Sequence, residues 1–192
     1  MDATGKYVLC DCTGYRLDGT DTEPGMYVGI IINRSLADTT DSVTGLGDVH
    51  ALVNAIGEMR RVAREASFIA IKVDDIAEVN ARFGFDAGDR VLAESAACLM
   101  ECSRGKGRLF RSTGPTFVAL FDDFDPEETD AIADEIERFL GSPVLIGSLE
   151  YQPPIRVATL HLDGVDRQPV SILNELKARL IEAPQVPGTK LD

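Results

Sequence analysis

Four basic residues lie within a short stretch of an otherwise acidic chain, and their charge and spacing could serve to bind an anion. They are Arg104, Lys106, Arg108 and Arg111, and the glycines between them would leave backbone N–H groups accessible to a phosphate or a carboxylate. Charge runs of this kind are also typical of a solvated surface that binds nothing. The sequence leaves both interpretations open.

Metal chemistry is poorly supported by the residue spacing. The four cysteines form no C-x-x-C pair, and both histidines lie far from them. Cys98 and Cys102 would share one face of a helix, where small core residues are the expected role. Asp122, Asp123 and Asp125 follow a predicted strand and suit either a weak cation site or a polar loop. We expect no zinc site and reduced thiols, as is typical of cytoplasmic proteins.

The composition is that of a globular protein with a marked acidic balance. The chain has 192 residues, 44% of them hydrophobic and 27% charged, with a formal net charge of −13. Such a charge disfavours nucleic acid and anionic membranes as primary partners. No apolar run approaches the roughly 20 residues of a membrane span, and no signal peptide is visible. We therefore expect a cytoplasmic location.

Hydrophobic periodicity predicts an alternation of helices and strands from residue 47 onwards. Asp74 is placed to cap one of the helices, and Gly114 and Pro115 indicate a hairpin turn. We expect α/β (α+β) architecture, with a central mixed sheet flanked by helices. The predicted helices are 47–65, 74–82, 86–102, 126–140 and 169–182, and the predicted strands are 67–73, 108–112, 116–121, 144–149 and 155–162.

The first residues form a separate segment in this interpretation. Two predicted strands, at 6–12 and 26–32, are joined by a loop rich in turn residues. Two strands alone cannot bury a face, so residues 1–36 are either an addition to the main domain or the tail of an upstream domain. The main domain is expected at 37–182, followed by a flexible tail at 183–192.

Three segments, in order and with matching spacing, resemble the GGDEF domain, the diguanylate cyclase family. Residues 41–46 (DSVTGL) resemble its DxLTGL opening, and residues 79–92 (VNARFGFDAGDRVL) resemble its IND-x-YGH-x-x-GD-x-VL segment. Residues 111–117 (RSTGPTF) fall where the signature hairpin belongs. The resemblance covers about residues 38–182. More weakly, GMYVGIIINRS resembles the last strand of a PAS sensor domain.

This resemblance implies a palm-like sheet related to those of nucleotidyl cyclases. Active members of the family join two GTP molecules into cyclic di-GMP across a dimer. Their chemistry needs a divalent metal, because the attacking oxygen must be activated and the phosphate charge neutralised. Mg²⁺ in turn demands carboxylate oxygens.

This sequence departs from the family pattern at the positions that supply those carboxylates. The metal-binding aspartate of the family aligns with Lys72, whose charge repels Mg²⁺. Threonine and proline stand where the signature has its two acids, so we expect no catalytic residue there and no Mg²⁺ at the family position. The five residues at the signature position are Thr113, Gly114, Pro115, Thr116 and Phe117.

Other family positions are retained in part. Asn80 and Asp89 match the residues that hydrogen-bond guanine, although both could instead serve helix ends. Lys72 could contact a nucleotide phosphate directly, or could simply extend to solvent. Arg104 keeps the arginine of the family's inhibitory RxxD site, but Gly107 stands in place of the aspartate.

The resemblance implies a catalytically degenerate GGDEF domain that regulates or senses guanine nucleotide in bacterial cyclic di-GMP signalling. Its partners would be a phosphodiesterase or output domain, attached or separate, with GTP as a ligand rather than a substrate. Two alternatives stay open. One is an active or residual diguanylate cyclase that recruits carboxylates from Asp74, Asp75 or a partner chain, and the other is a homodimeric scaffold that binds no nucleotide.

Overall fold

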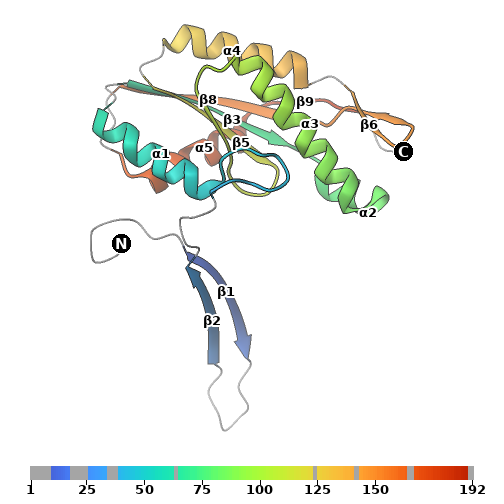
Figure 1. The fold of residues 1–192 in the computed structure, drawn as a ribbon, viewed down its shortest axis with the longest axis horizontal. Coiled ribbons are helices and arrows are strands. Elements are labelled where there is room, and N and C mark those ends of the chain that lie inside the picture. Colours follow the sequence, from blue (N-terminus) through green and yellow to red (C-terminus); the bar gives the residue numbers. More distant parts are fainter. Residues whose placement is uncertain are drawn as a thin grey trace. The chain divides into compact units, whose positions relative to one another are not determined.

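The chain divides into two compact units, residues 1–38 and 39–192. The structure, a computed structural model, describes residues 10–17, 26–33, 39–62, 65–122, 125–140, 143–163 and 167–189 (Figure 1). Residues 6–9 of the first predicted strand, Asp123, and the last three residues of the expected tail lie outside the described residues.

The first unit contains an antiparallel pair of strands. β1 (Cys10–Leu17) pairs with β2 (Met26–Asn33) along the whole length of both strands. Its relation to a PAS domain stays a prediction.

The second unit follows the order of elements that the periodicity predicted. Its helices are α1 (Val49–Val62), α2 (Ile76–Phe83), α3 (Phe85–Ser103), α4 (Pro126–Leu140) and α5 (Pro169–Glu182). Its strands are β3 (Glu65–Val73), β4 (Arg108–Arg111), β5 (Thr116–Asp122), β6 (Val144–Ile146), β7 (Leu149–Tyr151), β8 (Ile155–Asp163) and β9 (Gln185–Val186).

The central sheet has five strands in the order β4-β5-β3-β8-β9. Each of its ladders is antiparallel, whereas the sequence led us to expect a mixed sheet. A parallel bridge joins Gly47 to Phe110 at the edge strand. Helices flank the sheet on both sides, which confirms the expected α/β class with a palm-like sheet (Figure 1).

Each face of the sheet carries its own hydrophobic cluster. On one face, Ile69 and Ile71 of β3 pack with residues of α3 and α4. On the other face, Phe68 and Ala70 of the same strand pack with residues of α1 and α5. Because successive side chains of a strand point to opposite faces, the near-continuous apolar run of β3 is what a strand covered on both sides requires.

Two helices begin at aspartates that bind the free backbone N–H groups of the first turn. The Asp48 carboxylate accepts from His50 and Ala51 at the start of α1. The Asp125 carboxylate accepts from Glu127 at the start of α4. The acidic stretch around Asp125 therefore serves a helix start, in line with the polar-loop interpretation.

Three local features differ from the expectations. The single strand predicted at 144–149 is a hairpin, β6 and β7, which turns at Gly147 with a positive φ of 63°. Part of the expected tail forms β9, which pairs with β8. Helix α2 has Asp75 at its N-cap, with φ 61° and no side-chain cap, so the expected capping by Asp74 is wrong.

The helices of the described part of the chain are too short or too polar to cross a bilayer.

Candidate functional site

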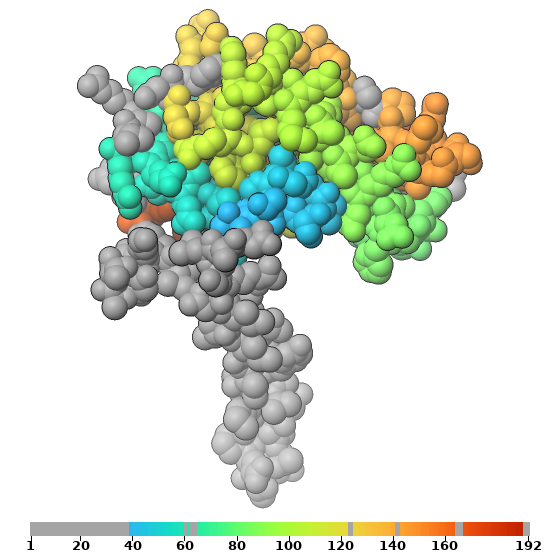
Figure 2. Space-filling view, viewed as in Figure 1, coloured from blue at the N-terminus to red at the C-terminus, as the bar shows by residue number. Residues whose placement is uncertain are grey.

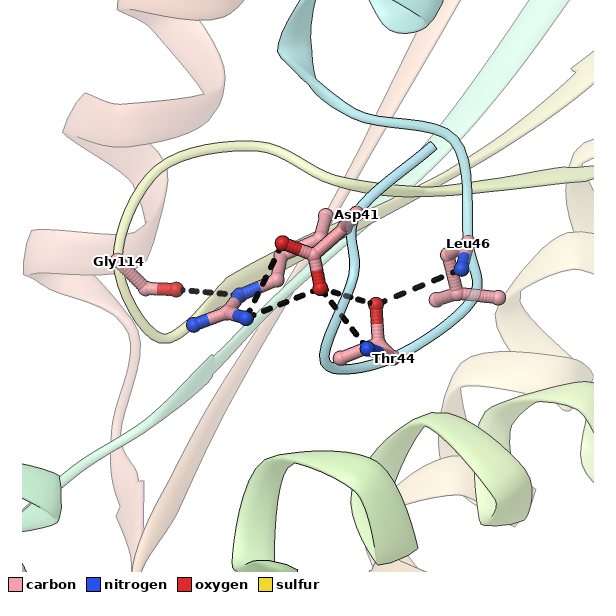
Figure 3. A network of polar contacts seen from close by, with 5 residues as sticks. Asp41, Thr44, Leu46 and Gly114 are labelled. Atoms are coloured by element: carbon pink, nitrogen blue, oxygen red, sulfur yellow. Dashed lines mark hydrogen bonds and ion pairs between the residues drawn. The ribbon is translucent and has the colours of Figure 1, made fainter. Parts of the chain in front are cut away.

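The opening segment, residues 41–46, is held to the turn between β4 and β5 by a polar network (Figure 3). Arg111 donates to both carboxylate oxygens of Asp41, at 3.0 and 3.2 Å, and to the carbonyl of Gly114 at 2.9 Å. Thr44 donates its N–H and its hydroxyl to Asp41. In Figure 2 the segment lies, in blue, on the surface between the side chains of α1 and those of α2 and α3.

This network favours the ionised form of the Asp41 carboxyl. Partial burial acts to raise the pKa of its carboxyl, but the hydrogen bonds from Thr44 and Arg111 outweigh burial, and the pKa is lowered. The opening segment therefore owes its place to a charge-assisted pair rather than to apolar packing alone.

The signature position forms the tight turn between β4 and β5. The N–H of Thr116 donates to the carbonyl of Thr113, and the N–H of Ser112 donates to the carbonyl of Thr116. Gly114 takes a positive φ of 57°, which suits glycine. The carbonyl of Pro115 accepts from Val73 at the end of β3. The proline thus joins the turn to the central strand through its carbonyl.

Lys72 lies in a row of side chains that crosses four strands. In register it stands opposite Thr116 of β5 on one side and Arg156 of β8 on the other. Arg156 in turn stands opposite Gln185 of β9. Since paired residues of adjacent strands share a face, these four side chains lie side by side on the α1–α5 face of the sheet.

Asp74 joins the row from just beyond β3. It accepts from Lys72 Nζ at 2.5 Å, from Arg156 Nε at 3.0 Å and from Gln185 Nε2 at 2.7 Å. Its side chain is only 8% exposed. Burial acts to raise the pKa of Asp74, but the bonds from Lys72, Gln185 and Arg156 outweigh it, and the pKa is lowered. These bonds explain why Asp74 does not cap α2.

The donor set at this position does not fit the Mg²⁺ that the resemblance implies. Lys72 offers a cation, and Thr116 offers a neutral hydroxyl. Both oxygens of Asp74 already accept from cationic or amide donors. Elsewhere in the described ranges, too, no group of three or more His, Cys, Asp or Glu side chains is gathered to hold a metal. Hard divalent cations need free carboxylate oxygens, which this row lacks.

Asn80 and Asp89 lie on the two helices that meet at Gly84. Asn80 is near the end of α2, half-buried, and its Oδ1 is buried without a hydrogen-bond partner among the described residues. It packs on Gly88 of α3, where a Cβ would lie 1.9 Å from that oxygen. Asp89 follows on α3 and is exposed. The two side chains are thus presented from adjacent helices, and Asn80 holds an unused acceptor.

The candidate site residues predicted from the sequence lie in two separate parts of the domain. Lys72, Thr113 and Thr116 line a cavity of about 510 Å³ on the α1–α5 face. Asn80 and Asp89 are not part of that lining. The structure therefore groups the expected phosphate contact with the signature turn, and groups the two expected guanine contacts with each other at the α2–α3 junction.

The four basic residues between positions 104 and 111 do not form an open anion site. Arg104 ends α3 and pairs with Glu135 of α4 at 2.7 Å. Arg108 pairs with Asp122 at 2.9 Å, and Arg111 belongs to the opening network. Three of the four charges are thus neutralised by acids of the chain, and the anion-binding interpretation is not supported.

Cys98 and Cys102 show no sign of reactivity. Cys98 and Cys102 are free thiols on one face of α3, with their sulfurs 4.0 Å apart. Burial, with the neighbouring Cys102, raises the pKa of Cys98 to about 12, so it stays a thiol at neutral pH.

Sequence reasoning missed two cationic side chains of the cavity lining, Arg156 and Lys177, and the Gln185 amide that binds Asp74. Arg156, Gln185 and Lys177 lie far from Lys72 in the chain, and Gln185 is 111 positions from the Asp74 it binds. Alternation along β8 could have placed Arg156 on the same face as Ala158 and Leu160. Nothing in the sequence indicated that β9 exists, so the place of Gln185 could not be inferred.

The comparisons with known proteins agree with this architecture. Residues 38–151 match the family described as diguanylate cyclase, GGDEF domain. A diguanylate cyclase, DgcS of Shewanella oneidensis, is 30% identical over 84 residues, which span 42% of this chain and 28% of that protein. The chain therefore matches little more than a quarter of this curated relative.

Solved structures show the same fold at low sequence identity. The FimX GGDEF domain of Pseudomonas aeruginosa has a TM-score of 0.71 at 18% identity, covering 77% of this chain and 94% of that chain. Diguanylate cyclase SiaD of the same species, in complex with its activator SiaC, has a TM-score of 0.70 at 20% identity, covering 76% and 58%. The DgcB GGDEF domain of Caulobacter crescentus, in complex with c-di-GMP, has a TM-score of 0.68 at 16% identity, covering 79% and 89%.

The family match spans more than half of the chain and ends only at β7. It includes the opening segment, the α2–α3 junction and the β4–β5 turn, the three places that carry the resemblance. This chain therefore belongs to the GGDEF family, the diguanylate cyclase domains of cyclic di-GMP signalling.

Proposed function

We propose that this domain is a catalytically degenerate GGDEF module that binds a guanine nucleotide without a divalent metal and has a regulatory role. The observation that carries the proposal is the Lys72–Thr116 pair. At the two positions where the family chemistry needs carboxylates, one strand presents an ammonium group and the other a hydroxyl. A fixed ammonium can contact phosphate oxygens directly, in place of a bound cation.

Asn80 supports the nucleotide part of the proposal. A buried carbonyl oxygen without a donor is costly, and a turn of the Asn80 amide that brings its Oδ1 out to a ligand N–H recovers that cost. Guanine offers N–H donors on its Watson–Crick edge, whereas adenine offers an N–H beside a bare ring nitrogen. The exposed carboxylate of Asp89, on the next helix, is a further acceptor for the same edge.

The regulatory part follows from the loss of metal ligands within a signalling family. A domain that holds nucleotide but does not cyclise it has two states, free and occupied, and can pass the difference to a neighbour. We propose an attached or separate phosphodiesterase or output domain as that neighbour.

Calorimetric titration of GTP into the whole chain tests this proposal. We expect binding in EDTA as well as in Mg²⁺, preference for GTP over ATP, and a loss of about tenfold in affinity in Asn80→Ala, as one hydrogen bond is removed. Asn54→Ala, an exposed asparagine of α1, is the matched control and should bind as the native chain does.

The variant Lys72→Asp tests the phosphate contact separately from the guanine contact. It should abolish binding in EDTA, because the phosphate contact is lost, while Mg²⁺ should restore part of it. Binding by the native chain that vanishes without Mg²⁺ would refute a phosphate contact by Lys72.

Two other outcomes correspond to the alternatives. Cyclic di-GMP formed from GTP in Mg²⁺ or Mn²⁺ would make the domain an enzyme. No binding at millimolar GTP, together with a mass that rises with concentration, would make it a dimerisation scaffold.

A further inference from the structure

The cavity on the α1–α5 face has a size and lining suited to a small ligand other than a nucleotide base. Its volume is about 510 Å³, within the range of small-molecule sites. Strands β3, β5 and β8 form its floor, and α5 and the start of α1 form its walls. The lining residues are Val49, Ala70, Lys72, Ser112, Thr113, Thr116, Val118, Arg156, Leu173, Asn174, Leu176, Lys177, Leu180 and Ile181.

Among the described residues, the charged part of the lining is cationic. Lys72, Arg156 and Lys177 face the cavity, and none of the described lining residues is an acid. Asp74 neutralises one charge of the Lys72–Arg156 pair. Lys177 has no hydrogen-bond or ion-pair partner among the described residues, so the described part of the lining carries a net positive charge.

Arg156 is oriented by contacts that leave its Nη2 amino group for a ligand. Its Nε binds Asp74, and its Nη1 binds the carbonyl of Ala183 at 2.8 Å. Its Nη2 has no partner in the described ranges. A guanidinium fixed in this way suits a carboxylate or a phosphate oxygen.

The remaining wall is aliphatic. Leu173, Leu176 and Leu180 follow one face of α5, opposite Ala70 and Val118 of the sheet. None of the lining residues that the structure describes is aromatic, so none of them would stack on a flat base. Ile181 also lines the cavity and is 69% exposed, a large apolar side chain left open to solvent.

We propose that this cavity binds an organic anion with an aliphatic body. A carboxylate or phosphate monoester head would meet Lys72, Arg156 and Lys177, while the hydrocarbon part would lie along the leucines of α5. The inference does not need nucleotide binding. It shares Lys72 with the proposed phosphate contact, so an occupant would compete with GTP for that ammonium group.

Calorimetry on the whole chain with four probes tests the proposal. Octanoate and octyl phosphate, both kept below their micelle concentrations, should bind. Octanol, which lacks the charge, and inorganic phosphate, which lacks the hydrocarbon, should each bind at least about tenfold more weakly. The stronger of the two anions identifies the head group. Equal binding of octanol and octanoate, or no binding of either anion at millimolar concentration, would overturn the proposal.

Variants locate the binding in the cavity. Lys177→Gln should weaken octanoate binding about tenfold, whereas Arg138→Gln, which removes a charge from α4, should not. Asn174→Trp places a large ring at an exposed lining position of α5 and should block the cavity. Its melting temperature, which should stay near that of the native chain, shows that it folds. Octanoate binding unaffected by both Lys177→Gln and Asn174→Trp would place the ligand elsewhere.

Asn80→Ala keeps this test independent of the proposed function. Octanoate should bind this variant as it binds the native chain, because Asn80 does not line the cavity. GTP binding can therefore fail while octanoate binding succeeds, and the reverse also holds.

Discussion

Asp74 accepts hydrogen bonds from side chains of three different strands, although it precedes a helix and has the type and place of a helix cap. Its partners are Lys72 on β3, Arg156 on β8 and Gln185 on β9. Two cations compete for this carboxylate, and their charge-assisted bonds are stronger than a bond to a backbone N–H. Asp75 is left at the N-cap in a left-handed conformation. The local preference of an aspartate at this position for capping the helix is thus overridden by hydrogen bonds to residues of three strands, two of them distant in the sequence.

Asp74→Asn should lower the free energy of unfolding by about 1–3 kcal/mol at neutral pH, because Lys72 and Arg156 lose their shared counter-charge. The folded pKa of Asp74 lies below its unfolded value. Its contribution is therefore complete above the unfolded value, about pH 4, and is lost as the pH falls through the folded value. Urea unfolding at pH ~7, ~5 and ~3 measures this contribution, which the variant lacks.

Asp134→Asn is the control for that series, since Asp134 is exposed on α4. It should follow the native chain at each pH. If Asp74→Asn loses as much stability between the two lower pH values as the native chain does, Asp74 is not the carboxylate that these bonds hold ionised.

Helices α2 and α3 meet at a junction where the missing side chain of Gly88 makes room for the amide of Asn80. Gly88 lies in the first turns of α3, where glycine is a poor helix former. The Oδ1 of Asn80 occupies the space that a Cβ would take. The junction thus gives up some helix stability to seat the amide of Asn80 between the helices.

Gly88→Ala should leave the domain folded, with a free energy of unfolding unchanged or raised by up to about 1 kcal/mol, because alanine favours the helix and the Asn80 amide can rotate away. GTP affinity should fall about tenfold, since the amide is displaced. Calorimetry and urea unfolding measure the two effects.

Gly57→Ala in α1 is the matched change, because nothing lies within 4 Å of its added Cβ. It should gain similar stability without any effect on GTP. Unchanged affinity in Gly88→Ala would remove Asn80 from the proposed guanine contact.

The elements themselves were largely predictable, and their exceptions have physical causes. Helices 126–140 and 169–182 agree with α4 and α5, because long amphipathic periods are a strong signal. The β6–β7 hairpin was missed because its strands are three residues each and their turn depends on one glycine. β9 was missed because a strand of two residues is too short to show the alternation of polar and apolar side chains that identifies a strand.

The candidate site was less predictable than the fold. The retained and altered family positions could be read from the sequence, including Lys72, Asn80 and Thr116. Their grouping could not, because it depends on the register of β3 against β5 and β8. The cationic lining contributed by Arg156 and Lys177 required the packing of α5 on the sheet.

At the scale of the whole molecule, charge and packing are distributed unevenly. The chain carries a net charge of −13, yet the described lining of the cavity contains three cations and no acid. Both hydrophobic clusters lie within residues 39–192. The second unit therefore contains its own core on both faces of the sheet, as an independently folding domain requires.

A fragment of residues 39–192 should unfold in urea at the same midpoint as the whole chain, because no described core residue is removed. Far-ultraviolet circular dichroism of both proteins measures this midpoint. A fragment less stable by more than about 1 kcal/mol, beyond the scatter of such extrapolations, would show that residues 1–38 contribute to the folded domain.

The Asp41–Arg111 pair has a mechanical consequence. Asp41 lies two residues after Thr39, where the second unit begins, and Arg111 ties it to the carbonyl of Gly114. Tension that enters the domain at residue 39 would load the hydrogen bond from the Asp48 N–H to the Thr39 carbonyl and then the Asp41–Arg111 pair. Because Arg111 is the last residue of β4, a pull on residue 39 would reach the edge strand of the sheet together with the Gly114 carbonyl of the signature turn.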